Sequence, residues 1–159
     1  MIIELSPKKI INGAYTVWNQ PGPEVDLVVD LKKLSFKEGS IEEMYVFHVL
    51  DHLFDNEIVP ALENWRKCLA PDRQLFVIVD DFEYLARAFV GGDLNIDDLN
   101  FSFAHPTNIT HDNLLRYMKA AGFSEEKIVT WRDNVQNAKG EIIFPKQQFE
   151  LIFSGKRNE

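Results

Sequence analysis

Two histidines four residues apart, with an aspartate between them, form the densest group of chemically active side chains in the sequence. The stretch "HVLDHL" carries His48, Asp51 and His52. Residues four apart share one face of a helix, so the two rings could hold one metal ion, with Asp51 or another carboxylate completing the site. Two histidines and one carboxylate, with no other ligand at a recognisable spacing, are an incomplete set. We therefore expect no metal site here, and a packing or capping role for His52.

A second acidic group follows the most convincing strand pattern of the chain. The stretch "VDDFEY" places Asp80, Asp81 and Glu83 together. Such carboxylates could act as a general base or hold a metal ion. Alternatively, they could mark a helix N-terminus, where the helix dipole favours negative charge. Both interpretations stay open. His105 and His111 could lie in the same cleft, but the sequence does not place them.

The composition is that of an ordinary packed domain. Of the 159 residues, 45% are hydrophobic and 12% aromatic, which suits a single domain over residues 1–159 with its own core. The formal charge of -8 repels phosphate backbones and anionic membranes, so we expect neither nucleic acid nor a membrane as partner. Cys68 is the only cysteine, and the first residues show no leader pattern, so we expect a reducing, cytoplasmic setting.

Apolar runs alternate with helical patterns along the chain. Runs rich in β-branched and aromatic residues predict strands at 1–5, 14–18, 25–31, 42–50, 73–81, 127–131 and 148–156. Amphipathic patterns predict helices at 55–72, 81–92 and 110–123. Almost no helix separates the first three strands. Pro60 falls in what would be the first turn of the first helix, where proline is tolerated.

The order of these elements predicts the architecture. Strands that alternate with helices favour a mainly parallel sheet, and a closing pair joined without a helix favours an antiparallel last strand. We therefore predict a seven-stranded α/β sheet. The long polar stretch at residues 91–108 would be either a lid over a ligand crevice or a plain surface loop.

Several motifs follow one another in a recognisable order. The third strand ends at Asp30 and is followed by "LSFKEGSIEE", "HVLDHL", a helix, "LAPDRQ" and "LFVIVDD". This order resembles the class I S-adenosylmethionine-dependent methyltransferases, particularly the small type-11 branch often found with cell-surface polysaccharide genes. The likeness runs over residues 2–90 and continues in "HPTNITHDNLLRYMKAAGF". It implies a Rossmann-like methyltransferase sheet, mainly parallel with an antiparallel last strand and with reduced N-terminal helices.

The resemblance also implies a cofactor and roles for particular residues. S-adenosylmethionine would lie in the crevice at the carboxyl ends of the strands. His48 and Asp80 would be the acid and base candidates. The residues expected around the cofactor are Glu4, Ser6, Asn19, Asp30, Leu31 and Phe47.

Two positions depart from the family pattern. Where the family has a glycine-rich turn similar to "L-D-x-G-C-G", this chain has "IELSPKK", so that Ser6, Pro7 and Lys8 occupy the place of the turn. Glycine allows a positive φ and leaves room for a ligand, whereas proline fixes φ and lysine fills volume. Trp18 stands where an acid would bind both ribose hydroxyls. Both departures predict a partly closed cofactor pocket.

Two functions are compatible with these residues. The first is an S-adenosylmethionine-dependent methyltransferase with an atypical cofactor turn, acting on a small-molecule or saccharide acceptor. The second is a non-catalytic methyltransferase-fold protein that binds another ligand in its crevice or a protein partner on its surface. An active enzyme needs Trp18 to turn away from the crevice, whereas an inactive relative could fill it with Trp18 or with the turn at Pro7 and Lys8.

Overall fold

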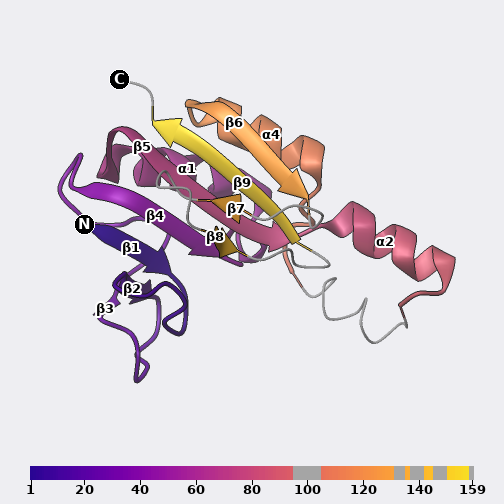
Figure 1. Ribbon diagram of the computed structural model, residues 1–159, viewed down its shortest axis with the longest axis horizontal. Helices are drawn as coiled ribbons and strands as arrows, with labels where there is room; N and C mark the ends of the chain where they lie inside the picture. Colours follow the sequence, from indigo (N-terminus) through magenta and orange to yellow (C-terminus); the bar gives the residue numbers. More distant parts are fainter. Residues whose placement is uncertain (95–104, 131–134, 137–141, 145–149, 158–159) are drawn as a thin grey trace.

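A computed structural model describes residues 1–94, 105–130, 135–136, 142–144 and 150–157 (Figure 1). The strands are β1 (Ile2–Leu5), β2 (Tyr15–Trp18), β3 (Leu27–Val28), β4 (Ile41–Phe47), β5 (Leu69–Asp80), β6 (Phe123–Thr130), β7 (Val135–Gln136), β8 (Ile142–Phe144) and β9 (Glu150–Arg157). The helices are α1 (Asp55–Cys68), α2 (Phe82–Gly91) and α4 (His111–Ala120), together with the short 3-10 helix η1 (Leu50–His52). Each predicted strand and helix has its counterpart among these elements.

Seven strands form one sheet in the order β3-β2-β1-β4-β5-β9-β6. The strands from β3 to β5 pair in parallel, and β9 pairs antiparallel with both β5 and β6. This confirms the predicted sheet, mainly parallel with an antiparallel last strand. Residues 1–49 are described in full and contain no helix, which confirms the reduced N-terminal helices. The strand order reverses between β1 and β4, and ligand crevices of open α/β sheets lie at such a switch point.

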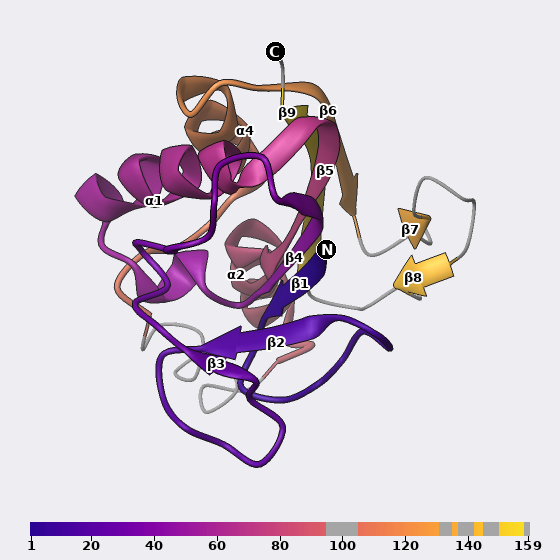
Figure 2. The ribbon, with the colours of Figure 1, turned by 90° about the vertical axis from the view of Figure 1, so that its left-hand side faces the viewer.

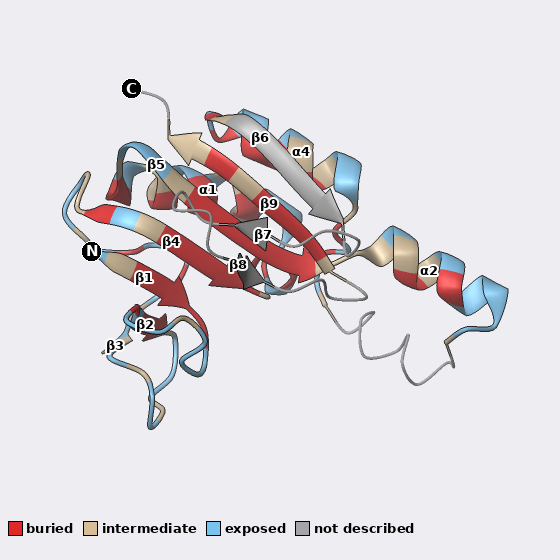
Figure 3. Cartoon of the chain, in the orientation of Figure 1, coloured by how far each residue is buried: buried red, intermediate tan, exposed pale blue. Residues whose placement is uncertain are grey.

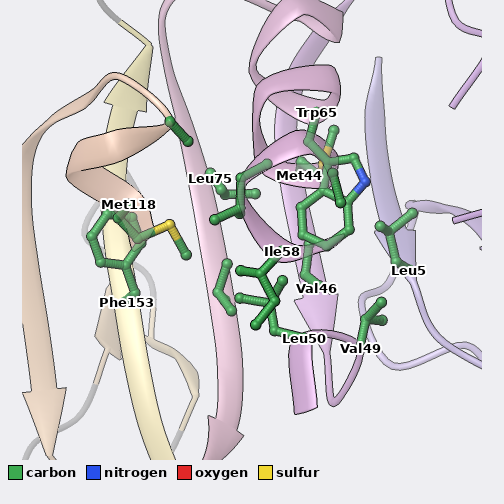
Figure 4. Packing of buried hydrophobic residues seen from close by; sticks show 14 of the residues in the cluster. Leu5, Met44, Val46, Val49, Leu50, Ile58, Trp65, Leu75, Met118 and Phe153 are labelled. Carbon is green, nitrogen blue, oxygen red and sulfur yellow. The ribbon is translucent and has the colours of Figure 1, made fainter. Parts of the chain in front are cut away.

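The sheet is covered on one face by α1 and α4 (Figure 2). Trp65 of α1 lies fully buried against β4, close to Met44 and Val46 (Figure 4), and its indole N–H donates to the carbonyl of Leu31 at 2.7 Å. A smaller cluster fills the opposite face and includes Tyr45, Phe47, Phe76, Ile78 and Ile152. Because side chains alternate between the two faces of a strand, β4 and β5 contribute to both clusters. The central strands are therefore buried on both faces (Figure 3), and this packing fixes the positions of the residues at their ends.

The prediction for Pro60 was wrong in its position. Helix α1 begins at Asp55, so Pro60 lies inside the helix rather than in its first turn. Proline has no N–H to donate to the carbonyl four residues earlier, which belongs to Asn56. Both residues are exposed, so that this carbonyl is accessible to water. The helix starts at the predicted residue 55, where the Glu57 carboxylate accepts the backbone N–H of Phe54 at 3.0 Å, which is one half of a capping box.

Other element boundaries also differ from the predictions. Strand β5 begins at Leu69 instead of residue 73, because Asp72 takes a left-handed conformation with φ 60° and the pairing with β4 shifts register there. Strand β3 is shorter than predicted, and β7 and β8 form a small two-stranded sheet that was not predicted. Most of the predicted lid or loop at residues 91–108 lies outside the described residues.

Candidate functional site

The ends of three neighbouring strands meet at one place on the carboxyl edge of the sheet. The parallel strands β4 and β5 end at Phe47 and Asp80, and the antiparallel strand β9 begins there at Glu150. Asp80 and Glu150 are direct partners in the ladder between β5 and β9. The backbone N–H of His48 continues the ladder by donating to the carbonyl of Ile78 at 2.9 Å. The sheet itself therefore brings His48, Asp80 and Glu150 together.

The His48 ring reaches three carboxylates. Its Nε2 lies 3.0 Å from Glu150 Oε1, which is a hydrogen-bond distance. Its Nδ1 lies 3.7 Å from Asp80 Oδ1 and 3.8 Å from Asp51 Oδ2, which are ion-pair distances. His48 adopts a left-handed backbone conformation with φ 49°, which is unfavourable for a residue with a side chain and is often seen at functional sites. The two predicted catalytic residues, His48 and Asp80, are thus neighbours.

The carboxylates control the charge of this cluster. Burial disfavours the charged form of His48, but Asp51, Glu150 and Asp80 outweigh that effect and raise the pKa of the ring to about 10. Burial also acts on Asp51, where nearby histidine rings, first of all His48, outweigh it and lower the pKa of the carboxyl. At Asp80 burial prevails and raises the pKa. At neutral pH the site holds an imidazolium among carboxylates, and Asp80 is the carboxylate best suited to take up a proton.

Asp51 lies at the centre of this cluster. It belongs to η1, its side chain is only 3% exposed, and neither of its carboxylate oxygens has a hydrogen-bond partner. His105 Nδ1 lies 3.5 Å from Asp51 Oδ2, and the His105 ring stands edge-on to the ring of His52, with centroids 4.5 Å apart. His111 is not part of the group, because it lies exposed at the start of α4 beside Asp112. The candidate site therefore includes two histidines beyond His48.

Hydrogen bonds hold the segment of His105 against η1. The backbone N–H of Thr107 donates to the carbonyl of Asp51 at 3.2 Å, and its hydroxyl donates to the carbonyl of Leu53 at 2.6 Å. A small pocket opens beside these residues. Its walls include Asp51, Asp80, Phe82, Leu85, His105 and Thr107. Acidic and imidazole groups thus face apolar side chains of α2 across a small space.

The predicted cofactor residue Glu4 is fully occupied by its own chain. Its carboxylate is completely buried and accepts the backbone N–H groups of Ile10, at 3.0 and 3.1 Å, and of Ile11, at 2.8 Å. It also accepts the hydroxyl of Thr16 at 2.8 Å. These bonds fix the turn that joins β1 to β2. Glu4 therefore serves to shape this turn and has little capacity left for a ligand.

Ser6 and its neighbours close the turn where the family has glycines. The Ser6 hydroxyl donates to the carbonyl of Lys8 at 2.6 Å and accepts the N–H of the same residue at 3.3 Å. A Cβ placed on Gly22 would lie 3.7 Å from the carbonyl oxygen of Pro7, so the loop after β2 passes close to the turn after β1. Trp18 at the end of β2 is half-buried and packs against the main core. By the family resemblance, the methionine and ribose parts of the cofactor would lie between these segments.

The other four predicted cofactor residues divide into two groups. Asn19 and Asp30 are exposed, and one oxygen of Asp30 accepts a backbone N–H two residues further on at 2.9 Å. Leu31 is buried beneath α1, and its carbonyl accepts the indole N–H of Trp65. Phe47 is buried in the smaller apolar cluster on the other face of the sheet. Of the six predicted cofactor residues only Asn19 and Asp30 are exposed, and the engaged carboxylate of Glu4 does not fit the glycine-rich cradle of the family pattern.

Sequence reasoning missed three members of the site. Asp51 was considered only as a partner of His48 and His52, His105 was left unplaced, and Glu150 was not considered. A signal for Glu150 existed, because an antiparallel last strand that pairs with β5 must begin beside the residue that ends β5. No comparable signal existed for His105, which reaches η1 through a tertiary contact.

The comparisons with known proteins agree with this architecture. No protein-family model matches the sequence, and no curated protein is significantly similar to it. An S-adenosylmethionine-dependent methyltransferase from Thermotoga maritima superimposes with a TM-score of 0.60 and 17% identity, over 84% of this chain and 64% of its own length. A chain from the complex of the Haloferax volcanii Trm112 methyltransferase activator with a methyltransferase gives 0.62 and 14%, over 99% and 82%. An Archaeoglobus fulgidus S-adenosylmethionine-dependent methyltransferase gives 0.61 and 9%, over 91% and 76%.

These likenesses define the fold of the chain. The strand order and the solved structures together show the class I methyltransferase fold, in agreement with the resemblance seen in the sequence. This chain spans 64% of the length of the Thermotoga protein. No helix within the described ranges is long and apolar enough to cross a membrane.

Proposed function

We propose that this chain is a ligand-binding protein with the methyltransferase fold that does not bind S-adenosylmethionine on its own. Its working site is the edge of the sheet where His48, Asp51, Asp80 and Glu150 meet. The observation that supports this most is the turn after β1, where the carboxylate of Glu4 is already saturated by donors of its own chain. The proposal rests on the site rather than on the fold, because one fold can carry many different functions.

The chemistry of the pocket favours a small cationic ligand. The carboxylates of Asp51 and Asp80 attract positive charge, and both are largely or partly withdrawn from solvent, which strengthens such attraction. Phe82 and Leu85 provide an apolar wall of the kind that orients a small molecule in a pocket. A cation about the size of a water molecule, such as a metal ion or the ammonium group of an amine, would fit this small space.

Titration calorimetry with S-adenosylmethionine and S-adenosylhomocysteine tests this proposal. We expect no detectable heat up to millimolar ligand and no thermal shift. Micromolar affinity for either ligand would overturn the proposal if the Asp30→Ala variant loses it. Asp30 is chosen because its side chain is exposed just after β3. Asp112→Ala, which removes a fully exposed carboxylate on α4 far along the chain, is the matched control.

The second candidate is an S-adenosylmethionine-dependent methyltransferase acting on a small-molecule or saccharide acceptor. The observation that favours it is the position of His48 and Asp80 on the carboxyl edge next to the switch point between β1 and β4. The sulfonium methyl group is already activated, so the chain would mainly orient the acceptor and remove its proton. Asp80, with its raised pKa, would be the group that takes this proton.

A protein partner could supply what the turn after β1 lacks. One structural neighbour comes from a complex between a methyltransferase and its activator protein, so an assembly of this kind exists for the fold. Under this version of the second candidate, the isolated chain gives no heat with S-adenosylmethionine, but a complex isolated from cells does. Calorimetry on both samples separates the partner-dependent enzyme from the ligand-binding protein.

A further inference from the structure

Three of the four histidines of the chain gather around a single buried carboxylate. His48 and His105 each approach Asp51 Oδ2, and His52 contacts the His105 ring. Asp51 belongs to two groups whose ligand atoms all lie within 4.8 Å of one another: one with His52 and His105, the other with His48 and Asp80. The sequence showed only two histidines and one acid at this point, and the fold adds the third histidine from a distant segment.

The buried carboxylate of Asp51 lacks the hydrogen-bond partners that burial normally requires. Both oxygens of Asp51 are without a hydrogen bond, although the side chain is only 3% exposed. Burying a charged group is costly unless it is paired or coordinates a metal ion, and buried polar groups in native proteins almost always have a partner. In the described structure Asp51 thus has ion-pair contacts with His48 and His105, but these contacts do not meet the geometry of a hydrogen bond.

The distance between Asp51 and His105 suits two ligands of one metal ion. Ligand atoms at the corners of a tetrahedral zinc site lie roughly 3.4 Å apart, since each bond measures about 2.0–2.2 Å. His105 Nδ1 and Asp51 Oδ2 are separated by 3.5 Å. Two histidines and one carboxylate form a known ligand set for zinc and for ferrous iron, with positions left for water or another ligand.

The surrounding charges also favour a cation. The carboxylates of Asp51, Asp80 and Glu150 all contact His48, whose ring can carry at most one positive charge. The carboxylates around His48 therefore outnumber the single charge that its ring can carry, and a divalent cation beside them would be attracted. His48 is already engaged by Glu150 through Nε2 and lies farther from Asp51 than His105 does, so His52 and His105 are the better ligands.

We propose that Asp51, His52 and His105 bind one divalent transition-metal ion. The ligands come from two segments that are already fixed to each other by the hydrogen bonds from Thr107 to Asp51 and Leu53, so the site is largely formed before the ion arrives. His52 is exposed, which gives the ion access from solvent. This proposal rests on the proposed role of this edge of the sheet but not on the closed turn after β1.

Titration of the chelator-treated full chain with Zn²⁺ tests the site. We expect one ion per chain with micromolar or tighter affinity, and an increase in melting temperature. Co²⁺ in place of Zn²⁺ should give visible absorption bands that report the coordination geometry. The variants His52→Ala and Asp51→Asn should weaken Zn²⁺ binding by roughly 100-fold or more, because each removes a ligand. Since His52 is exposed, its variant should melt like the wild-type chain without metal.

Two control variants distinguish this site from its alternatives. His111→Ala removes an exposed histidine outside the cluster and should leave the affinity unchanged within a factor of two. Asp80→Asn should weaken binding less than His52→Ala. Absence of binding up to millimolar Zn²⁺ would overturn the proposal, as would unchanged affinity in His52→Ala together with its loss in Asp80→Asn. Neither result would bear on the cofactor titration, which tests the turn after β1.

Discussion

The edge at β1 and β2 and the edge at β4 and β5 treat their buried acids in opposite ways. Glu4 is fully buried and its carboxylate accepts hydrogen bonds from two backbone N–H groups and one hydroxyl of its own chain. Asp51 is almost as deeply buried, but neither oxygen receives a hydrogen bond. The first carboxylate completes the structure around it, whereas the second leaves binding capacity unused. On this difference rests our proposal that a ligand binds at the ends of β4 and β5 rather than at the turn after β1.

The contrast also concerns the backbone. Residues 6–14 form turns held by side chains, with the Ser6 hydroxyl bonded to Lys8 and the carboxylate of Glu4 bonded to Ile10 and Ile11. At the other edge, His48 keeps a left-handed conformation that is uncommon for residues other than glycine. An unfavourable conformation is retained where the surrounding structure imposes it, which often occurs at functional sites. The four predictions below test this contrast, from the largest expected effect to the smallest.

Replacing Glu4 should reduce the stability of the protein more than the other substitutions. Glu4→Ala leaves the N–H groups of Ile10 and Ile11 and the hydroxyl of Thr16 without their acceptor, so we expect a loss of about 3–5 kcal/mol in the free energy of unfolding. Urea denaturation measures it. Glu63→Ala, which removes an exposed carboxylate of α1, is the control and should leave the midpoint unchanged. Equal stability of the two variants would mean that Glu4 is free for a ligand after all.

The charge of His48 should persist far above the range of an ordinary histidine. With metal removed by a chelator, NMR titration should give a pKa of about 10 for His48, compared with 6.5 for an unperturbed ring. Because the folded-state pKa is the higher one, its contribution to stability is complete below pH 6.5 and is lost as the pH rises through 10. Glu150→Gln should lower the pKa, whereas Glu83→Gln, on the exposed face of α2, should not. A pKa near 6.5 in the wild-type chain would contradict the cluster geometry.

The bond that fixes the segment of His105 should contribute measurably to stability. Thr107→Val keeps the shape of the side chain but removes the buried hydrogen bond to Leu53, so we expect a loss of about 1–2 kcal/mol in unfolding free energy. Ser40→Ala removes an exposed hydroxyl bond of the same length, 2.6 Å, to the carbonyl of Lys37. It should cost clearly less, because water replaces the lost partner. If both variants lose the same stability by urea denaturation, the segment is not held by Thr107.

The smallest effect is expected at the opposite edge of the sheet. Asp72 has φ 60°, a conformation that glycine adopts without strain, so Asp72→Gly should stabilise the protein by about 0.5–1 kcal/mol. The neighbouring Arg73 has no positive φ, and Arg73→Gly should destabilise it through the added freedom of the unfolded chain. Thermal melting of both variants measures the difference. A melting temperature that falls in Asp72→Gly would show that its side chain contributes more than its strain costs.

The fold could be predicted from the sequence because its signals are local. The apolar runs of β1, β4, β5 and β9 and the helical spacing in α1 and α4 recur over short distances, and the absence of a helix before residue 50 is visible directly. The predicted range 55–72 starts where α1 does, but no serine or threonine marks this start and the apolar spacing begins only at Ile58. Consequently Pro60 was expected one turn too early in the helix.

The candidate site was predicted only in part. His48 and Asp80 each follow an apolar strand, and strands that are parallel neighbours end together, so their proximity could be expected. The burial of Asp51, the approach of His105 and the saturation of Glu4 depend on which segments fold over one another. Residues 51 and 105 are brought together by Thr107, and no pattern in the sequence marks that hydrogen bond.

The sequence by itself therefore determined the class of fold, the strands that carry His48 and Asp80, and the replacement of the glycine-rich turn. Those features depend on residue types and on periodicity along the chain. Only the tertiary structure decided that Glu4 is consumed by its own turn and that Asp51 is left without hydrogen bonds among three histidines. The physical reason is that the burial and pairing of a charged group depend on contacts between segments distant in the chain.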